Sequence, residues 1–561
     1  MASSLVNIAS SGLKAAQTLL NTTGNNITNA QTAGYSRQTV SLSSTVGQST
    51  SYGEVGTGVA VSSVNREYNA LTVAQLRDAS ASYAETSAYY NQLSQIDSLL
   101  AGSITSGTST TTTSASIDST LSDFFSSLST LSSDASSTSS RQAVLNSAQA
   151  LVTQLQTADN YLASMDTAIN QEVSTTVDTI NSYAEQIAEL NAQISSMGSV
   201  GASANSLLDQ RDQLINNLND LVGVTVSTQG DSMVTVSLSN GLALVQGGTA
   251  YGLAAVADSA DPSSVTVAYD NGSGTLTSIN EDNIDGGSLA GLFAARDDID
   301  NTRNSLGLIA LELAGNMNEL QSEGVDMNGD AGTDFFSYSD PSVVSNSKNS
   351  GSATLSAAYS DISSVAASDY TLSYKDGSWS VKQVSDGSTV SYTASTDSDG
   401  NATLSFDGLT ITVSGDVAEG DSFTAKTVSG VISNLSVALS DGTQIAAGLD
   451  DDETGDSDNR NLESMIDLQT AKLIDGNSTL TQSYASLISD IGIKTSSANS
   501  LSTSQSTIVT SLTEKQQSVS GVSLDEEYIN LYSAQQYYTA CSQVLSTANT
   551  IFDSLLSAIN S

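Results

Sequence analysis

Clusters of acidic side chains are the first places in this sequence where chemistry could occur. The stretch Asp326-Met-Asn-Gly-Asp330 resembles a calcium-binding loop at first sight. An EF-hand loop, however, requires glycine at its sixth position and a carboxylate at its twelfth, and this sequence has Ala331 and Ser337 there. The stretch therefore predicts a polar turn in front of Phe335 and Phe336, with no bound metal.

The residues that most enzymes use for catalysis are scarce. Histidine is absent, which removes the commonest general base and the commonest transition-metal ligand. Cys541 is the only cysteine, and its place in an apolar helical stripe predicts a small hydrophobic side chain and not a nucleophile. The acidic run at 450–453 predicts a solvated loop, and no paired carboxylates stand out for a hydrolase. We therefore expect no enzyme activity, no metal and no cofactor.

Size and charge narrow the remaining functions. The chain has 561 residues, which predicts three or more domains, and its 60 acidic and 16 basic residues give a net charge of −44. Such a polyanion repels phosphate groups, so we expect neither nucleic acid nor an anionic lipid surface as a partner. Residues 1–9 contain no basic segment, and no apolar run is long enough for a signal peptide or a membrane span. The protein is therefore expected to be cytosolic or to be exported without a cleaved signal.

Apolar residues at both ends of the chain recur at alternating spacings of three and four. This spacing places them along one side of a helix, as in helices that pack lengthwise against a partner. A helix buried in a globular core would show the same stripe. We favour paired helices, because both stripes lie at chain ends and no proline interrupts them. The residues expected on these seams are Leu5, Ile8, Leu13 and Leu20 near the start, and Leu531, Tyr538, Leu545, Phe552, Leu555 and Ile559 near the end.

Between the two ends, a long helical pattern is followed by short strand patterns. Residues 141–197 contain neither glycine nor proline and repeat apolar residues with helical spacing. At ~1.5 Å per residue this stretch predicts a rod on the order of 80 Å long. A second helix is expected at about 462–512, and another begins near Leu71. Alternating residues at 222–226 and 233–238 predict a hairpin.

From about 350 to 428 the pattern is almost entirely that of β-strands, with Asp-Gly turns between them. The whole chain therefore predicts an α+β fold that is elongated and multi-domain, with terminal coiled-coil-forming helices, a long helical rod and an inserted β domain. The expected strands are Asp369–Tyr374, Trp379–Val384, Ala402–Phe406 and Leu409–Val413. The expected domains are 1–50 with 510–561, 51–349 with 444–509, and the insert 350–443.

One stretch after the first helix carries a family resemblance. Residues 25–38 read Asn-Asn-Ile-Thr-Asn-Ala-Gln-Thr-Ala-Gly-Tyr-Ser-Arg-Gln, which resembles the signature of bacterial flagellar axial proteins. Its Tyr-Ser-Arg-Gln ending resembles the family of the first hook-associated proteins in particular. The asparagine and threonine residues, Asn26 among them, favour a helix end, Gly34 permits a backbone turn with positive φ, and Tyr35 anchors the exit of the chain.

Three further segments agree with this resemblance and occur in the order of that family. Leu-Leu-Asp-Gln-Arg-Asp-Gln-Leu at 207–214 is similar to its central motif. Residues 324–329 with Phe335 and Phe336 resemble its second landmark, and residues 520–527 and 535–538 resemble its C-terminal block. The resemblance thus covers almost the whole chain, apart from the insert between 350 and 445.

The resemblance implies a structural adaptor between the flagellar hook and the filament. Such a protein is exported through the flagellar type III channel and localises to the hook–filament junction. It assembles end-on as a ring at the distal hook, through its terminal helices, and is a platform for filament growth. The implied partners are the hook protein, a second junction protein, other copies of the same chain, and a flagellar export chaperone at the C-terminal helix. Asn26, Gly34 and Tyr35 join the seam residues as the expected assembly interface.

Other classes of protein remain open at this point. A flagellin would lack Tyr35–Gln38 and the 207–214 segment, and a hook protein would lack the long helix at 141–197. An acidic secreted adhesin or surface-layer protein would share the charge and the β-strands. It would, however, be expected to contain repeats and bound calcium, and no clear repeats are visible.

Overall fold

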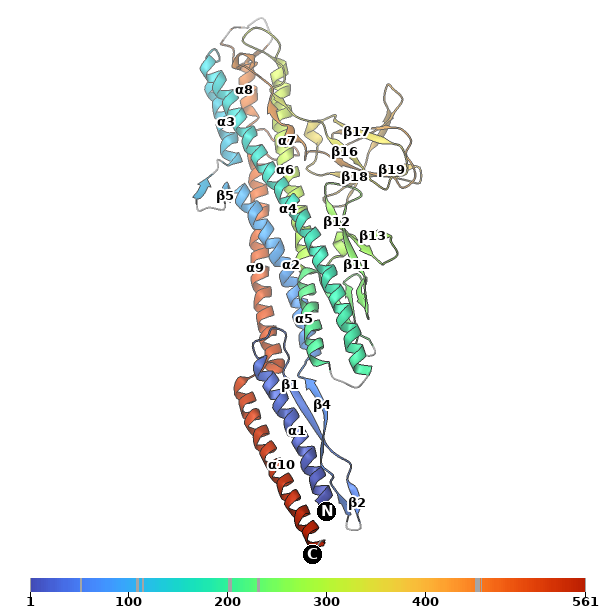
Figure 1. The fold of residues 1–561 in the computed structure, drawn as a ribbon. Coiled ribbons are helices and arrows are strands. Elements are labelled where there is room, and N and C mark those ends of the chain that lie inside the picture. Colours follow the sequence, from blue (N-terminus) through green and yellow to red (C-terminus); the bar gives the residue numbers. More distant parts are fainter. Residues whose placement is uncertain are drawn as a thin grey trace.

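The structure, a computed structural model, describes residues 2–50, 53–106, 110–113, 116–199, 204–229, 233–449, 455 and 457–559. The molecule is elongated, with a helical rod in the middle and a β lobe on one side of it (Figure 1). Both chain ends lie together in a separate terminal unit below the rod. The acidic run expected to form a solvated loop at 450–453 is outside the described residues.

Long helices build the rod, and the longest of them follows the predicted pattern. α4 (Thr138–Ser199) has 62 residues and buries apolar side chains at alternating three- and four-residue spacings along its length. The prediction of a helix at 141–197 is confirmed, and so is the helix near Leu71. The other helices of the rod are α2 (Ala70–Leu100), α3 (Ile117–Ser132), α5 (Asn205–Leu221), α6 (Gly287–Glu323), α7 (Val431–Asn434), α8 (Arg460–Asp467) and α9 (Leu480–Ser520).

The single helix expected at 462–512 is wrong, because the chain breaks between α8 and α9. Asp475 and Gly476 adopt positive φ angles of 52° and 65°, which a continuous right-handed helix does not allow. Thr479 then starts α9 with a capping box, in which its side chain and that of Gln482 each accept a backbone N–H of the other residue. The apolar spacing continues across this break, so periodicity alone did not reveal it.

Buried polar contacts join the helices of the rod to one another. The carboxylate of Asp298 on α6 accepts hydrogen bonds from Tyr89 on α2, at 2.6 Å, and from Lys494 on α9. Arg303 on α6 donates to Asp159 on α4 at 2.9 Å. Because a buried charge is stable only when it is paired, these contacts fix which helix faces meet.

Two small sheets cover α4 on the side of the lobe (Figure 1). The hairpin predicted near 222–238 is confirmed, since β7 pairs with β8 from Val224↔Leu238 to Thr228↔Val234. Asn191 of α4 donates to the carbonyls of Val234 and Gly247 and so attaches this sheet to the rod. The strands are β7 (Val224–Thr228), β8 (Val234–Leu238), β9 (Ala243–Gln246) and β10 (Thr249–Ala250), then β11 (Gly252–Ala257), β12 (Val265–Asp270) and β13 (Leu276–Ser278). A separate hairpin joins β5 (Ser103–Ser106) and β6 (Thr110–Thr113).

The lobe consists of two antiparallel sheets, and all four strands predicted there are present. Asp376-Gly377 and Asp407-Gly408 form the tight turns with positive φ that the sequence indicated. One sheet has the order β16 (Ser342–Ser345), β24 (Ser422–Lys426), β18 (Tyr370–Lys375), β19 (Ser378–Gln383), β20 (Thr389–Val390). The other has the order β17 (Thr354–Tyr359), β23 (Leu409–Ser414), β22 (Ala402–Phe406), β21 (Thr393–Thr396).

The chain leaves the rod for the lobe and returns to it through two short strand pairs. β14 (Gly324–Val325) pairs with β26 (Gly448–Leu449), and β15 (Phe336–Ser337) pairs with β25 (Ser436–Val437). Residues on the returning segment belong to the rod: Val431 and Ile432 are buried, and the carbonyls of Gly442 and Ile445 accept hydrogen bonds from the buried Arg141. We therefore propose 342–426 as the inserted domain, in place of 350–443.

The terminal unit contains two helices and a β ribbon. α1 (Ala2–Thr28) pairs with α10 (Leu524–Ile559), and the ribbon of β1 (Gln38–Ser44) and β4 (Val59–Arg66) lies along α1. The ribbon ends in β2 (Gln48–Thr50) and β3 (Gly53–Val55). Because α9 continues along the rod to Ser520, we propose that the terminal domain comprises 2–66 and 524–559, in place of 1–50 and 510–561.

Two deletions of different length distinguish the lobe from the rod. Replacing residues 344–427 by a short Gly-Ser linker is expected to leave the rod folded, because the strand pairs at its base remain. Extending the deletion to 443 also removes Val431, Ile432 and Leu435 from the core. At about 1.5–3 kcal/mol for each buried aliphatic side chain, the longer deletion should cost about 5 kcal/mol or more.

Thermal unfolding followed by circular dichroism measures both variants. The shorter deletion should retain the unfolding midpoint of the helices, and the longer one should lower it strongly. Equal loss of stability in the two variants would show that the lobe is part of the rod's own core.

Candidate assembly interface

Small side chains allow α1 and α10 to pack closely in an antiparallel pair. Ala9, Gly12 and Ala16 on α1 are buried, as are Ala534 and Ala548 on α10. A methyl group added at Gly12 would lie 2.6 Å from Sγ of Cys541, so a larger residue would force the helices apart. Cys541 is half-buried at this contact, as the stripe containing it predicted.

Asn26 joins three segments at the end of this helix pair. Its side-chain Nδ2 donates to the carbonyl of Gln38, at 2.9 Å, and to Oε2 of Glu527 on α10, at 3.0 Å. Its Oδ1 accepts from the hydroxyl of Tyr35, at 2.8 Å, and from the backbone N–H of Gln38, at 3.0 Å. Because Asn26 and Glu527 are both buried, the bond between them is shielded from competing water, and the bonds to Gln38 and Tyr35 are partly shielded.

The loop after α1 is held in one conformation by Gly34 and Tyr35. Gly34 has a φ of 77°, and a methyl group there would lie 2.7 Å from Oε1 of Gln213 on α5. Burial raises the pKa of Tyr35 to about 12, and the carboxylates of Asp209 and Glu527 add to this rise. The phenol therefore stays protonated at neutral pH and remains a donor to Asn26.

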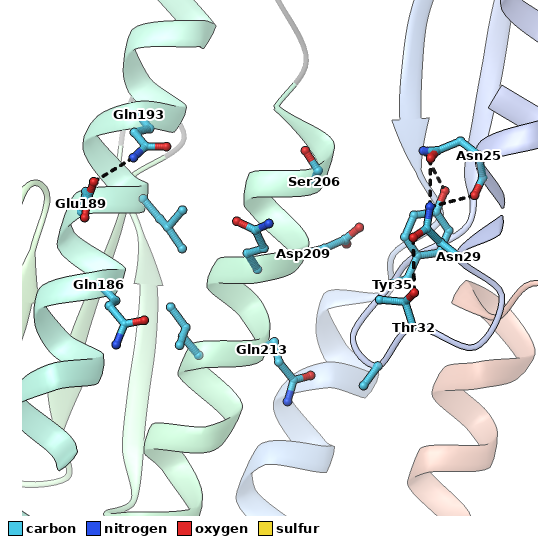
Figure 2. Close-up of a pocket in the computed structure, with 14 residues that line it drawn as sticks. Asn25, Asn29, Thr32, Tyr35, Gln186, Glu189, Gln193, Ser206, Asp209 and Gln213 are labelled. Carbon is cyan, nitrogen blue, oxygen red and sulfur yellow. Dashed lines mark hydrogen bonds between the residues drawn. The ribbon is translucent and has the colours of Figure 1, made fainter. Parts of the chain in front are cut away.

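The segment 207–214 meets this loop from the side of the rod. Figure 2 shows Asn25 of α1 and Thr32 and Tyr35 of the loop on one side of a cleft, and Asp209 and Gln213 of α5 on the other. The cleft has a volume of about 590 Å³ and is lined mostly by amides and hydroxyls. It contains hydrogen-bonding groups but no evident nucleophile and base pair, so its chemistry suits contact between polypeptide segments.

Two carboxylates of the same segment attach the ribbon to the rod. Arg66, the last residue of β4, donates to Asp209 at 2.8 Å and to Asp212 at 3.0 Å. Burial alone would lower the pKa of the Arg66 guanidinium. The carboxylates of Asp212 and Asp209 have the larger combined effect and raise this pKa. Asn205 at the start of α5 donates to the carbonyl of Val64 on the same strand, at 2.9 Å.

The opposite side of the loop contacts the link between α9 and α10. The backbone N–H of Arg37 donates to the carbonyl of Ser520, at 2.8 Å, and its guanidinium donates to Glu526, at 2.9 Å. The loop is thus held between α5 and residues 520–526. The family signature at 25–38, the central motif at 207–214 and the C-terminal block at 520–527 therefore meet in space.

The predicted seam residues fall into three groups. Ile8, Leu13, Leu20, Leu531 and Leu545 are half-buried in the terminal unit. Leu5, Tyr538 and Phe552 are exposed, with accessible fractions of 38%, 42% and 51%. Leu555 and Ile559 belong to α10, but their side chains are outside the described part of the chain.

A second apolar face of α10 includes Tyr528, which the sequence placed on the same seam as Leu531, and Ile529 and Tyr532, which the sequence analysis missed. Tyr528, Ile529 and Tyr532 are 59%, 67% and 64% exposed, on the side of the helix away from the buried Glu527 and Ala534. Asp209, Asp212 and Arg66 were also missed as site residues. The only signal for the two carboxylates was their place in the 207–214 motif, because their partner Arg66 is far away in sequence.

The remaining features give no second kind of site. Asp326 accepts the backbone N–H groups of Asn328 and Asp330, so its segment forms the polar turn that the sequence predicted. In the part of the chain that the structure describes, no group of three or more acidic or cysteine side chains could hold a metal ion. Within those same residues, no helix is both long enough and apolar enough to span a bilayer.

Comparisons with known proteins agree with this arrangement. Residues 93–336 match the model of the flagellar hook-associated protein FlgK helical domain, residues 344–427 match the flagellar hook-associated protein 1 D2-like domain, and residues 515–558 match the flagellar basal body rod FlgEFG protein C-terminal region. Flagellar hook-associated protein 1 of Escherichia coli is 45% identical over 558 residues, covering 99% of each chain. This chain belongs to the flagellar hook-associated protein 1 family.

Other relatives extend the comparison beyond the enteric bacteria. The Salmonella typhimurium family member is also 45% identical, and that of Bacillus subtilis is 26% identical over 98% of this chain and 96% of its own. The solved structure of the flagellar hook junction protein FlgK from Burkholderia pseudomallei matches with a TM-score of 0.72 and 27% identity, covering 80% of this chain and 100% of that one. Membership of this family rejects the adhesin, flagellin and hook-protein alternatives.

Replacing Asn26 by aspartate tests the hydrogen bonds at the base of the terminal unit. The variant Asn26→Asp keeps the shape but replaces a donor to Glu527 by a second carboxylate. Loss of the bond and repulsion at a buried site should weaken the packing of α1 and the following loop on α10 by about 2–4 kcal/mol. Limited proteolysis should then cut residues 28–38 faster than in the parent protein.

Asn21→Asp is the matched control, since Asn21 is exposed on the same helix. It should leave the cleavage rate unchanged. If both variants are cut at the rate of the parent protein, the bonds of Asn26 do not fix the loop.

Proposed function

We propose that this chain, a structural component of the flagellar hook–filament junction, assembles end-on at the distal hook through α1 and α10. The supporting observation is the two-sided character of α10. One side packs on α1 through small residues. Tyr528 and Tyr532 are exposed on another side, and Phe552, which continues the packing stripe toward the end of the helix, is also exposed. Exposed apolar surface of this extent is typical of a protein contact.

The proposed partners follow from the family and from the placement of the helices. They are other copies of this chain in a ring, the hook protein on one side and the second junction protein on the other. A flagellar export chaperone would cover the C-terminal helix before export. We propose that export uses the flagellar type III channel without a cleaved signal peptide, and that the chain has no enzymatic activity and no cofactor.

Rigid attachment of the terminal unit to the rod suits an adaptor that transmits torque. Arg66 connects the ribbon to α5 of the rod through charged hydrogen bonds to Asp209 and Asp212, and Asn26 connects α1 to α10 within the terminal unit. A load applied to the terminal helices therefore reaches the rod through short polar contacts. The junction would then be a platform on which the filament grows.

A charged residue at the end of α10 tests the proposed role of the exposed seam. Phe552→Asp is expected to leave the monomer folded, since the side chain contacts mainly solvent. In the assembled ring the carboxylate would be buried without a partner, which should reduce hook-tip occupancy at least about tenfold. Cells should then be non-motile and release flagellin into the medium.

Val384→Asp is the control, because Val384 is 56% exposed but lies in the lobe. Both proteins should be exported in equal amounts. Normal filaments in the Phe552→Asp cells would contradict the proposed role of this seam.

A further inference from the structure

The outward face of α9 carries a stripe of exposed aliphatic side chains. Ile493, Leu501 and Ile508 are 65%, 47% and 44% exposed. They are eight and seven residues apart, close to two helical turns each, so they follow one side of the helix. The opposite side packs on α2 and α6 through Tyr484, Ile491 and Ala498. α9 forms the edge of the rod that faces away from the lobe and from the two small sheets on α4 (Figure 1).

The segment of α9 that carries this stripe has no acidic side chain of its own. Between Ile491 and Thr513 the only ionisable residue is Lys494, and its ammonium is bound to Asp298 within the rod. The whole chain carries 60 acidic and 16 basic residues. Neighbouring copies therefore repel one another wherever their acidic surfaces face. This repulsion is weaker along a helix segment that has no carboxylate of its own, although Asp97 of α2 lies half-buried beside Gly492.

We propose that the stripe of Ile493, Leu501 and Ile508 contacts a second copy of this chain at its side. This inference rests on the proposed function, because it names the surface between neighbours in the ring. A closed ring brings two different surfaces together, so the stripe meets another face of the neighbouring copy. Serines fill the positions between the aliphatic residues, at 497, 500, 504 and 511, and their small size allows close approach.

The size of the stripe explains why it does not join copies in solution. From Asp490 to Lys515 a helix extends about 40 Å and is about 10 Å wide, which gives about 400 Å² for each copy. A stable interface buries about 800 Å² for each partner. The contact therefore forms only where the terminal helices already hold two copies together at high effective concentration.

Site-specific photocrosslinking in cells tests which molecule covers the stripe. A photoreactive phenylalanine derivative replaces Leu501 in the full-length chain, and purified hooks are irradiated. We expect a product with the mass of two copies of this chain. A product with another protein, or no product although the chain is present at the hook tip, would overturn the inference. Absence of the unmodified chain from hook tips would instead contradict the proposed function.

A charge at the same position gives a second, independent measurement. Leu501→Asp should fold as the parent protein does, yet its hook-tip occupancy should fall about tenfold. Leu276→Asp is the matched control, because Leu276 is also 47% exposed but lies on β13. If Leu501→Asp and Leu276→Asp occupy hook tips equally while Phe552→Asp remains defective, the proposed α9 contact is rejected. The proposed role of the terminal helices is then unaffected.

Discussion

Asn26 lies where α1 ends, α10 begins and the chain turns into the ribbon. Its amide satisfies both of its hydrogen-bonding ends with Tyr35, Gln38 and Glu527, and each partner belongs to a different part of this crossing. At this end of the pair, one buried side chain therefore holds the two terminal helices and the loop together. Arg66 extends the same connection to α5, so that the direction of the terminal unit relative to the rod is set by polar geometry.

In the terminal unit, small apolar residues make the closest contacts between the two helices, while several large apolar residues of α10 remain exposed. The closest contacts between α1 and α10 use alanine, glycine and the half-buried Cys541, and larger residues such as Leu13 and Leu545 are half-buried beside them. The large residues Tyr528, Tyr532 and Phe552 are then left for other molecules.

The parts of this architecture that follow from a local sequence pattern could be predicted. α4 follows from apolar spacing without glycine or proline, and the turn at Asp376-Gly377 follows from its residue types. The β1–β4 ribbon was missed. None of its residues is fully buried, and half-buried and exposed positions do not alternate along either strand, so no strong pattern marks a core face. The contact of Arg66 with Asp209 joins residues far apart in sequence, and no periodic pattern encodes it. Which residues of α10 face α1 was equally hidden, because Tyr538 and Phe552 share the spacing of Leu545 yet remain exposed.

Oxidative footprinting tests most directly whether the large apolar residues of α10 are buried by assembly. Hydroxyl radicals modify exposed aromatic side chains, and mass spectrometry compares the isolated protein with purified hooks that carry it. The account predicts that Tyr528, Tyr532 and Phe552 react in the isolated chain and are protected at the hook tip. Trp379 in the lobe should react equally in both. Unchanged reactivity of the three α10 residues on assembly would contradict the account.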